Sequence, residues 1–88
     1  MENSSNLYGK KLLFIVDNCF SITSRELSLN DVYIAVVLET SFEPIPLSED
    51  NLKRRIRDKL DCLYSIKKID RIEYKTEKNV KYYKYKRK

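Results

Sequence analysis

The 88-residue sequence has no histidine and no tryptophan, and it has only one glycine and two cysteines. Without histidine, the chain cannot form a Ser-His-Asp or Cys-His catalytic pair, or a zinc site with imidazole ligands. A single glycine excludes the glycine-rich loops that bind phosphates in P-loop and dinucleotide-binding proteins. Only carboxylates, lysines and tyrosines remain to carry chemistry, so we expect no enzymatic activity and no cofactor.

The two cysteines, Cys19 and Cys62, lie far apart in the sequence. Two thiols cannot complete a four-cysteine zinc site, and we interpret both as small hydrophobic residues of the core. No hydrophobic run approaches the roughly 20 residues of a membrane span, and the polar residues 1–6 do not resemble a secretory signal. These features predict an intracellular, reduced protein, cytoplasmic or nuclear, with no membrane partner.

Positive charge is concentrated in the second half of the chain, although the formal net charge of the whole is only +5. Residues 1–46 carry three basic and six acidic side chains, a net charge of −3. Residues 47–88 carry 15 basic and seven acidic side chains, a net charge of +8. The basic half indicates a surface that binds a polyanion, and the acidic half is a candidate surface for a protein partner or a second copy of the chain.

The hydrophobic pattern predicts one domain over residues 7–86, between a flexible segment 1–6 and a basic tail 87–88. Residues 7–20 and about 31–39 fit helices, the second of them capped by Ser28 or Asn30. In the first helix, Leu13, Phe14 and Phe20 would widen the buried face. Both stretches are also good strand material, because periodicity does not separate short apolar runs. Pro44 and Pro46 exclude regular structure over residues 40–47.

The clearest element is an amphipathic helix that begins after Ser48, a natural N-cap. Its apolar residues recur at spacings of four, four and three, at Leu52, Ile56, Leu60 and Leu63. This spacing places them on one face of a helix of about four turns. Basic residues occupy much of the N-terminal half of the opposite face.

Two stretches that alternate in polarity, residues 66–75 and 80–86, predict a β-hairpin with its turn at residues 76–79. Asn79 suits the left-handed conformation that such a turn requires. Tyr82, Tyr83 and Tyr85 alternate with lysines along the second strand. We favour cross-strand packing for these tyrosines over stacking on single-stranded bases.

A resemblance to a known family rests on three stretches of the chain. They are Asn51-Leu-Lys-Arg-Arg-Ile-Arg-Asp-Lys-Leu-Asp-Cys-Leu, residues 69–74 and residues 80–85. In this order, they resemble the recognition helix and wing of the winged helix-turn-helix family of DNA-binding domains. In size and in its richness in Lys, Tyr and Ile, the chain is similar to small transcriptional regulators of archaea and their viruses. The resemblance implies an α+β fold, with three helices followed by a C-terminal β-hairpin wing. The alternative is a ββαββ sheet with one helix, in which residues 11–16 and 32–38 are strands.

The resemblance implies a sequence-specific protein that binds double-stranded DNA and regulates transcription. The helix at 48–64 would enter the major groove, and the 69–86 hairpin would act as the wing. Asn51 and Arg54 would read bases, because Asn and Arg bind adenine and guanine edges bidentately. The predicted DNA-binding residues are Asn51, Lys53, Arg54, Arg55, Arg57, Lys75, Lys78 and Lys81.

Two alternatives to DNA binding stay open. The basic helix face is also consistent with a solvated surface, on which Arg54–Asp58 and Arg57–Asp61 form ion pairs at a spacing of four residues. A winged-helix domain can also serve as a protein–protein interaction module of a larger assembly. A homodimer is a further expectation, because many small regulators bind palindromic half-sites.

Overall fold

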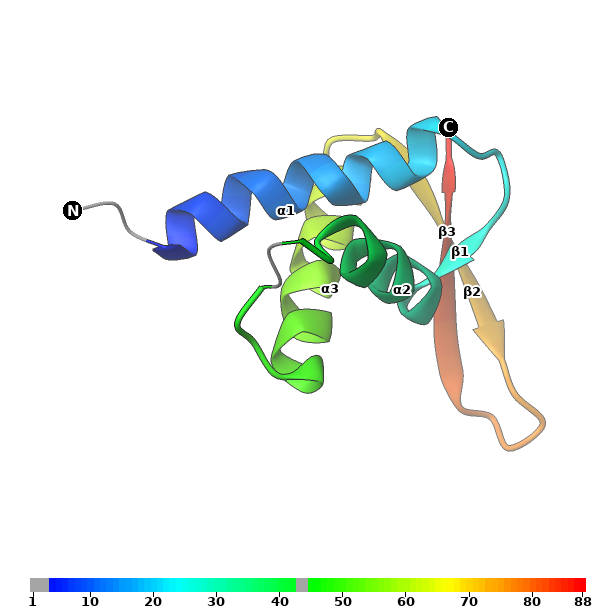
Figure 1. The fold of residues 1–88 in the computed structure, drawn as a ribbon. Helices are drawn as coiled ribbons and strands as arrows, with labels where there is room; N and C mark the ends of the chain where they lie inside the picture. Colours follow the sequence, from blue (N-terminus) through cyan, green and yellow to red (C-terminus); the bar gives the residue numbers. More distant parts are fainter. Residues whose placement is uncertain (1–3, 43–44) are drawn as a thin grey trace.

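A computed structural model of the chain describes residues 4–42 and 45–88, and the fold contains three helices and one three-stranded antiparallel sheet (Figure 1). The expected α+β class is therefore confirmed. In the described ranges, no helix is both long enough and apolar enough to cross a membrane. The elements, in chain order, are α1 (Ser4–Ser21), β1 (Leu27–Ser28), α2 (Leu29–Glu39), α3 (Glu49–Ser65), β2 (Ile69–Lys75) and β3 (Lys81–Arg87).

The alternative ββαββ arrangement is wrong, because residues 11–16 lie within α1 and residues 32–38 lie within α2. The buried residues of α1 decide the period: Leu12, Ile15, Val16 and Cys19 are all buried, at spacings of three, one and three. A strand would bury alternate residues instead. The buried face of α1 is narrower than predicted, because Phe14 projects from the opposite side of the helix and is 71% exposed.

Helix α2 begins with a capping box, which selects Ser28 over Asn30 as the N-cap. The Asp31 amide donates to Ser28 Oγ at 3.1 Å, and the Ser28 amide donates to Asp31 Oδ2 at 3.0 Å. The hydrogen bond from the Ser28 backbone lowers the pKa of the Asp31 carboxyl below its ordinary value. Ser28 also pairs with Lys84 in the sheet, so the cap fixes the start of α2 against β3.

Helix α3 has the predicted cap and the predicted core face. The Asn51 amide donates to Ser48 Oγ at 3.3 Å, and the four apolar residues of the stripe from Leu52 to Leu63 are all buried. The helix ends at Ser65, and Lys67, just after the C-cap residue Ile66, is left-handed with a φ of 65°. The Lys68 amide then donates to Leu63 O at 3.0 Å, the long hydrogen bond of a Schellman motif, and the chain turns into β2.

The three strands are ordered β1-β3-β2, and β2 and β3 form the expected hairpin. Asn79 has a φ of 61°, as predicted for the turn, and its amide donates to Thr76 O at 2.9 Å. In the hairpin, Arg71 lies opposite Tyr85 and Lys75 lies opposite Lys81. Because side chains alternate along a strand, these four residues share one face of the sheet.

One hydrophobic core joins the three helices to the base of the sheet, where Ile69 and Tyr85 are buried. The rest of the hairpin extends away from the helices (Figure 1). Cys19 lies in this core, and burial raises the pKa of its thiol. Cys62 does not, because it lies off the apolar stripe of α3 and is exposed. The prediction of two core cysteines was therefore wrong for Cys62.

The ends of the chain are more regular than expected. Residues 4–6 form the first turn of α1 instead of a flexible segment, and residues 1–3 lie outside the described residues. The predicted tail also belongs to the sheet: Arg87 lies opposite Ile69 in β3, and its guanidinium donates to Ser21 O at 3.4 Å. Lys88 forms an ion pair with Asp70 at 3.8 Å.

Candidate nucleic-acid interface

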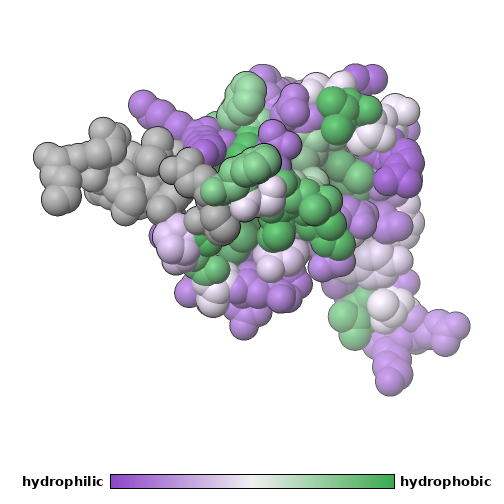
Figure 2. Space-filling model, viewed as in Figure 1, coloured by the Kyte–Doolittle hydropathy of each residue, from purple (hydrophilic) through white to green (hydrophobic). Residues whose placement is uncertain are grey.

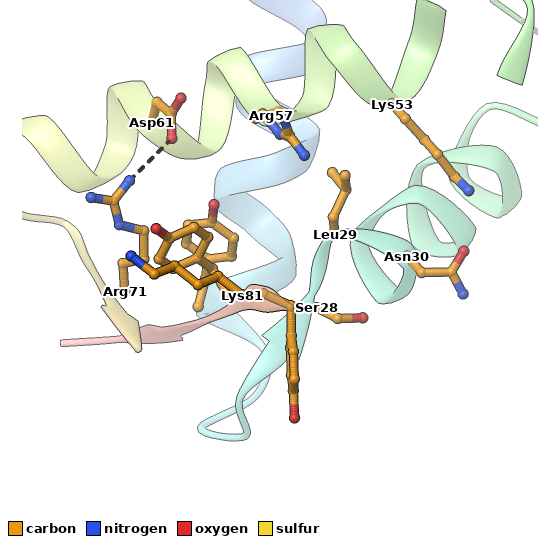
Figure 3. Close-up of a pocket in the computed structure, with 11 residues that line it drawn as sticks. Ser28, Leu29, Asn30, Lys53, Arg57, Asp61, Arg71 and Lys81 are labelled. Carbon is orange, nitrogen blue, oxygen red and sulfur yellow. Dashed lines mark ion pairs between the residues drawn. The ribbon is translucent and has the colours of Figure 1, made fainter. Parts of the chain in front are cut away.

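A groove of about 450 Å³ lies between α3, the start of α2 and the hairpin (Figure 3). We call it the basic groove, because four of its side chains are cations and only one is an anion. Segments far apart in the sequence meet there, so the groove depends on the fold. Its lining residues are Ser28, Leu29, Asn30, Lys53, Arg57, Asp61, Arg71, Lys81, Tyr82, Tyr83 and Tyr85.

Helix α3 contributes Lys53, Arg57 and Asp61, which are spaced by four residues and so form one row along the helix. In Figure 3, Lys53 and Arg57 project from α3 toward Leu29 and Asn30 at the start of α2. Lys53 Nζ lies 2.9 Å from a carboxylate oxygen of Glu49, and this hydrogen bond raises the pKa of the lysine.

Arg57 has no ion-pair partner among the residues that the structure describes. The expected Arg57–Asp61 pair does not form, because Asp61 turns to Arg71 on β2, with Nη1 and Oδ1 3.8 Å apart. The expected Arg54–Asp58 pair is likewise absent among the described residues. Two arginines of α3 therefore keep their full charge available for an anion.

Arg71 connects the hairpin to α3. Its guanidinium carbon lies 4.4 Å from the ring centroid of Tyr64 in α3 and 4.9 Å from that of Tyr83 in β3. The Tyr83 hydroxyl also lies 3.5 Å from a carboxylate oxygen of Glu73, directly across the hairpin. These contacts hold the base of the hairpin at a fixed distance from α3, although Arg71 itself is partly neutralised by Asp61.

The outer part of the hairpin adds three exposed cations. Lys75 and Lys81 lie opposite each other on the face of the sheet that includes Arg71, and Lys78 lies in the turn beyond them. Like charges at opposite positions repel, so this part of the hairpin favours a bound anion.

The other face of the hairpin is occupied by packing between tyrosines. The rings of Tyr74 and Tyr82 stack at a centroid distance of 5.4 Å, and Lys84 Nζ lies 5.7 Å from the Tyr74 ring centroid. The Tyr74 hydroxyl donates to Glu26, which raises the pKa of the phenol. Cross-strand packing is thus confirmed for Tyr82, while Tyr85 is buried in the core.

Comparison of the chain with protein-family models, curated proteins and solved structures finds no match. The assignment of the interface therefore depends on the chemistry of its own residues. In the ranges 4–42 and 45–88, no three side chains of the types His, Cys, Asp and Glu are grouped as a metal site would require.

The structure brings three of the eight predicted residues, Lys53, Arg57 and Lys81, together in the basic groove. Lys75 and Lys78 continue this surface along the hairpin. Arg54 is exposed and lies next to the groove row on the helix surface, about 60° from Arg57. These six cations form what we call the basic surface: Lys53, Arg54, Arg57, Lys75, Lys78 and Lys81.

Asn51 and Arg55 lie elsewhere. A rotation of about 100° per residue places Arg55 about 160° around α3 from Arg57, and Asn51 about 120° from it. Both are exposed, but on the side of the helix that does not line the groove.

Sequence reasoning missed Asn30, Arg71 and Tyr83. A signal existed for Arg71, since it lies two residues after the core residue Ile69 and therefore shares its face of the strand. None existed for Asn30, which reaches the groove only because α2 packs beside α3.

Proposed function

We propose that the chain is a winged-helix protein that binds double-stranded DNA in a sequence-specific manner and acts as a regulator of transcription. One observation carries the proposal: Arg57 of α3 and Lys81 of the hairpin line the same groove, and neither has an ion-pair partner among the described residues. Two successive elements, a helix and a hairpin, present positive charge to one side, where a single polyanion can contact both. A solvated helix face would require no such agreement with the hairpin.

The dimensions of the two elements suit a duplex. The major groove admits an α-helix, and a projecting hairpin reaches the neighbouring backbone or minor groove. In this arrangement, Arg54 lies at the outermost part of α3 and faces the base edges. Arg57 and the hairpin lysines contact phosphates, which set position but carry no sequence information.

The start of α2 supplies a further phosphate contact in this arrangement. Asn30 lies in the first turn of α2, beside Lys53, where backbone amides and the helix dipole favour an anion. Asp31 already occupies part of this helix end through the capping box. We therefore assign Asn30 a neutral hydrogen bond to the DNA backbone.

A salt titration tests the proposal. If the five cations of the basic surface other than Arg54 each contact one phosphate, log K for a random-sequence duplex should fall with log salt concentration at a slope of about −4.5. Fluorescence anisotropy at a series of salt concentrations measures this slope. A flat response, or no binding at low salt, would contradict the proposal.

Selection of binding sites from random duplex DNA then tests specificity. Enrichment of a defined sequence supports the regulator, whereas unenriched recovery of all sequences contradicts the sequence-specific part of the proposal. The alternative function is a winged-helix module that binds protein in a larger assembly. A stoichiometric protein partner together with no duplex binding at low salt would support that alternative.

A further inference from the structure

Helix α2 is apolar on the side that faces solvent as well as on the side that faces the core. Asp31 and Glu39, near its two ends, are its only charged residues. Ile34, Val37 and Leu38 on its outer side are 48%, 42% and 70% exposed. A helix that is hydrophobic all round is normally buried, so the outer face of α2 lacks the contact that its composition suits.

The apolar surface continues from α2 onto α1, where Phe14 and Ile22 are 71% and 79% exposed. Ile22 lines a shallow groove together with Ile34, and Phe14 and Ile22 line a second one with Ala35. Figure 2 shows hydrophobic residues gathered over α1 and α2, whereas the hairpin is mainly hydrophilic. We call the five residues Phe14, Ile22, Ile34, Val37 and Leu38 the apolar face.

The area of the apolar face matches what a dimer requires. The exposed fractions of its five side chains amount to about three whole residues. At about 150–200 Å² for each residue, the lower part of the range for large side chains, this is on the order of 450–600 Å² of apolar surface. A standard interface buries about 800 Å² on each partner, of which about 65% is apolar in homodimers. The apolar face alone therefore supplies the hydrophobic part of such an interface.

The apolar face also has the shape that self-association needs. In a two-fold interface, the same surface must carry both the projections and the hollows that receive them. Here Phe14, Ile22 and Leu38 project, and the two shallow grooves between α1 and α2, of about 300 and 80 Å³, lie among them. The five side chains are uncharged, although Arg25 and Asp31 also line the larger groove and Glu39 the smaller one.

We propose that the apolar face binds a second copy of this chain across a two-fold axis. This inference goes beyond the proposed function, since it concerns α1 and α2 and requires no nucleic acid. The cations of the basic surface lie on α3 and the hairpin, so they remain exposed in the dimer. Two such surfaces related by a two-fold axis are suited to the two halves of a palindromic site.

Sedimentation equilibrium without DNA tests the dimer, over protein concentrations from about 1 to 100 μM, the range of moderate interfaces. The expected mass is twice that of the chain. Leu38→Glu places a charge within the apolar face, and it should raise the dissociation constant of the dimer at least about tenfold. Circular dichroism checks that this exposed position leaves the helices intact.

Ile66→Glu is the matched control, because Ile66 is 57% exposed but lies at the end of α3, outside the apolar face. This variant should dimerise as the unmodified chain does. A single-chain mass for the unmodified protein at every concentration would overturn the proposal and leave the face for a different protein. Equal weakening by both variants would also overturn it. Neither result depends on duplex binding, so this proposal and the proposed function can fail separately.

Discussion

The guanidinium carbon of Arg71, in β2, lies 4.4 Å from the ring centroid of Tyr64, in the last turn of α3. Each residue belongs to a different arm of the basic groove. The contact therefore fixes the distance between the cations of α3 and those of the hairpin, and it does so with a residue that is itself paired to Asp61. Arg71 is a positioning residue for the interface.

Replacement of Arg71 should weaken duplex binding although it removes none of the six cations of the basic surface. We expect Arg71→Met to lower affinity about three- to tenfold, because the loss of two cation–π contacts frees the hairpin. Arg71→Lys should recover little of this loss, since a lysine lacks the planar group that stacks on tyrosine. Fluorescence anisotropy with one duplex measures all three proteins. Lys86→Met is the control, because Lys86 lies on the opposite face of the hairpin and its replacement removes the same charge. Equal losses for Met at 71 and at 86 would contradict the positioning role.

The hairpin lysines should act without regard to DNA sequence. Lys78→Ala and Lys81→Ala should each reduce the magnitude of the salt slope by about one, because each removes one phosphate contact. The relative preference among duplexes should stay unchanged. A salt titration on two duplexes of different sequence makes this measurement, and an unaltered slope in both variants would place the hairpin outside the interface.

Arg54 should instead control which sequence is bound. Its position at the outermost part of α3 suits a bidentate contact with guanine, worth about 1–3 kcal/mol of discrimination. Arg54→Ala should therefore relax the preference at one base pair and leave other positions as they were. Site selection with the variant gives the outcome, and an unchanged selected motif would assign Arg54 to phosphate instead.

The capping box at the start of α2 should make stability depend on pH in the acid range. Ser28→Ala should lower the free energy of unfolding by about 1 kcal/mol, the usual cost of a lost N-cap. The pKa of Asp31 is lower in the folded chain than in the unfolded one, so its contribution is complete above the ordinary aspartate pKa of about 4. That contribution is lost as the pH falls through the folded value.

Asp31→Asn tests the sign of this effect. Urea unfolding should show the variant to be less stable than the unmodified chain at neutral pH, and the gap should close as the pH is lowered. A gap that persists below the folded pKa of Asp31 would show that the carboxylate charge contributes nothing.

The sequence predicted the elements whose patterns are regular and missed what depends on packing between them. The spacing of Leu52, Ile56 and Leu60 identified α3 and its buried face, and Asn79 identified the turn of the hairpin. Periodicity could not separate helix from strand in α1 and α2, because both are dense in apolar residues. Their helical form is fixed by which residues meet α3 in the core.

Two errors had a signal in the sequence. Phe14 and Cys62 were assigned to the core for their residue type, yet each lies two residues after a buried leucine, on the other side of its helix. The site was predicted only in part, because residue type was again used without knowledge of how the elements pack. Side-chain chemistry alone selected Arg55, for its charge, and Asn51, for its amide. Only the position of the hairpin determines which side of α3 forms a groove.

A comparison of two arginines on α3 tests whether the side of the helix that faces the hairpin binds DNA. Arg57 lines the basic groove, whereas Arg55 is exposed on the side away from it. Arg57→Ala and Arg55→Ala remove the same charge from positions two residues apart on one helix, so non-specific attraction falls equally in both. We predict that Arg57→Ala reduces duplex affinity about tenfold at near-physiological salt, and that Arg55→Ala reduces it less than about twofold. Equal losses, or a larger loss for Arg55→Ala, would show that the groove side of α3 is not the side that binds DNA.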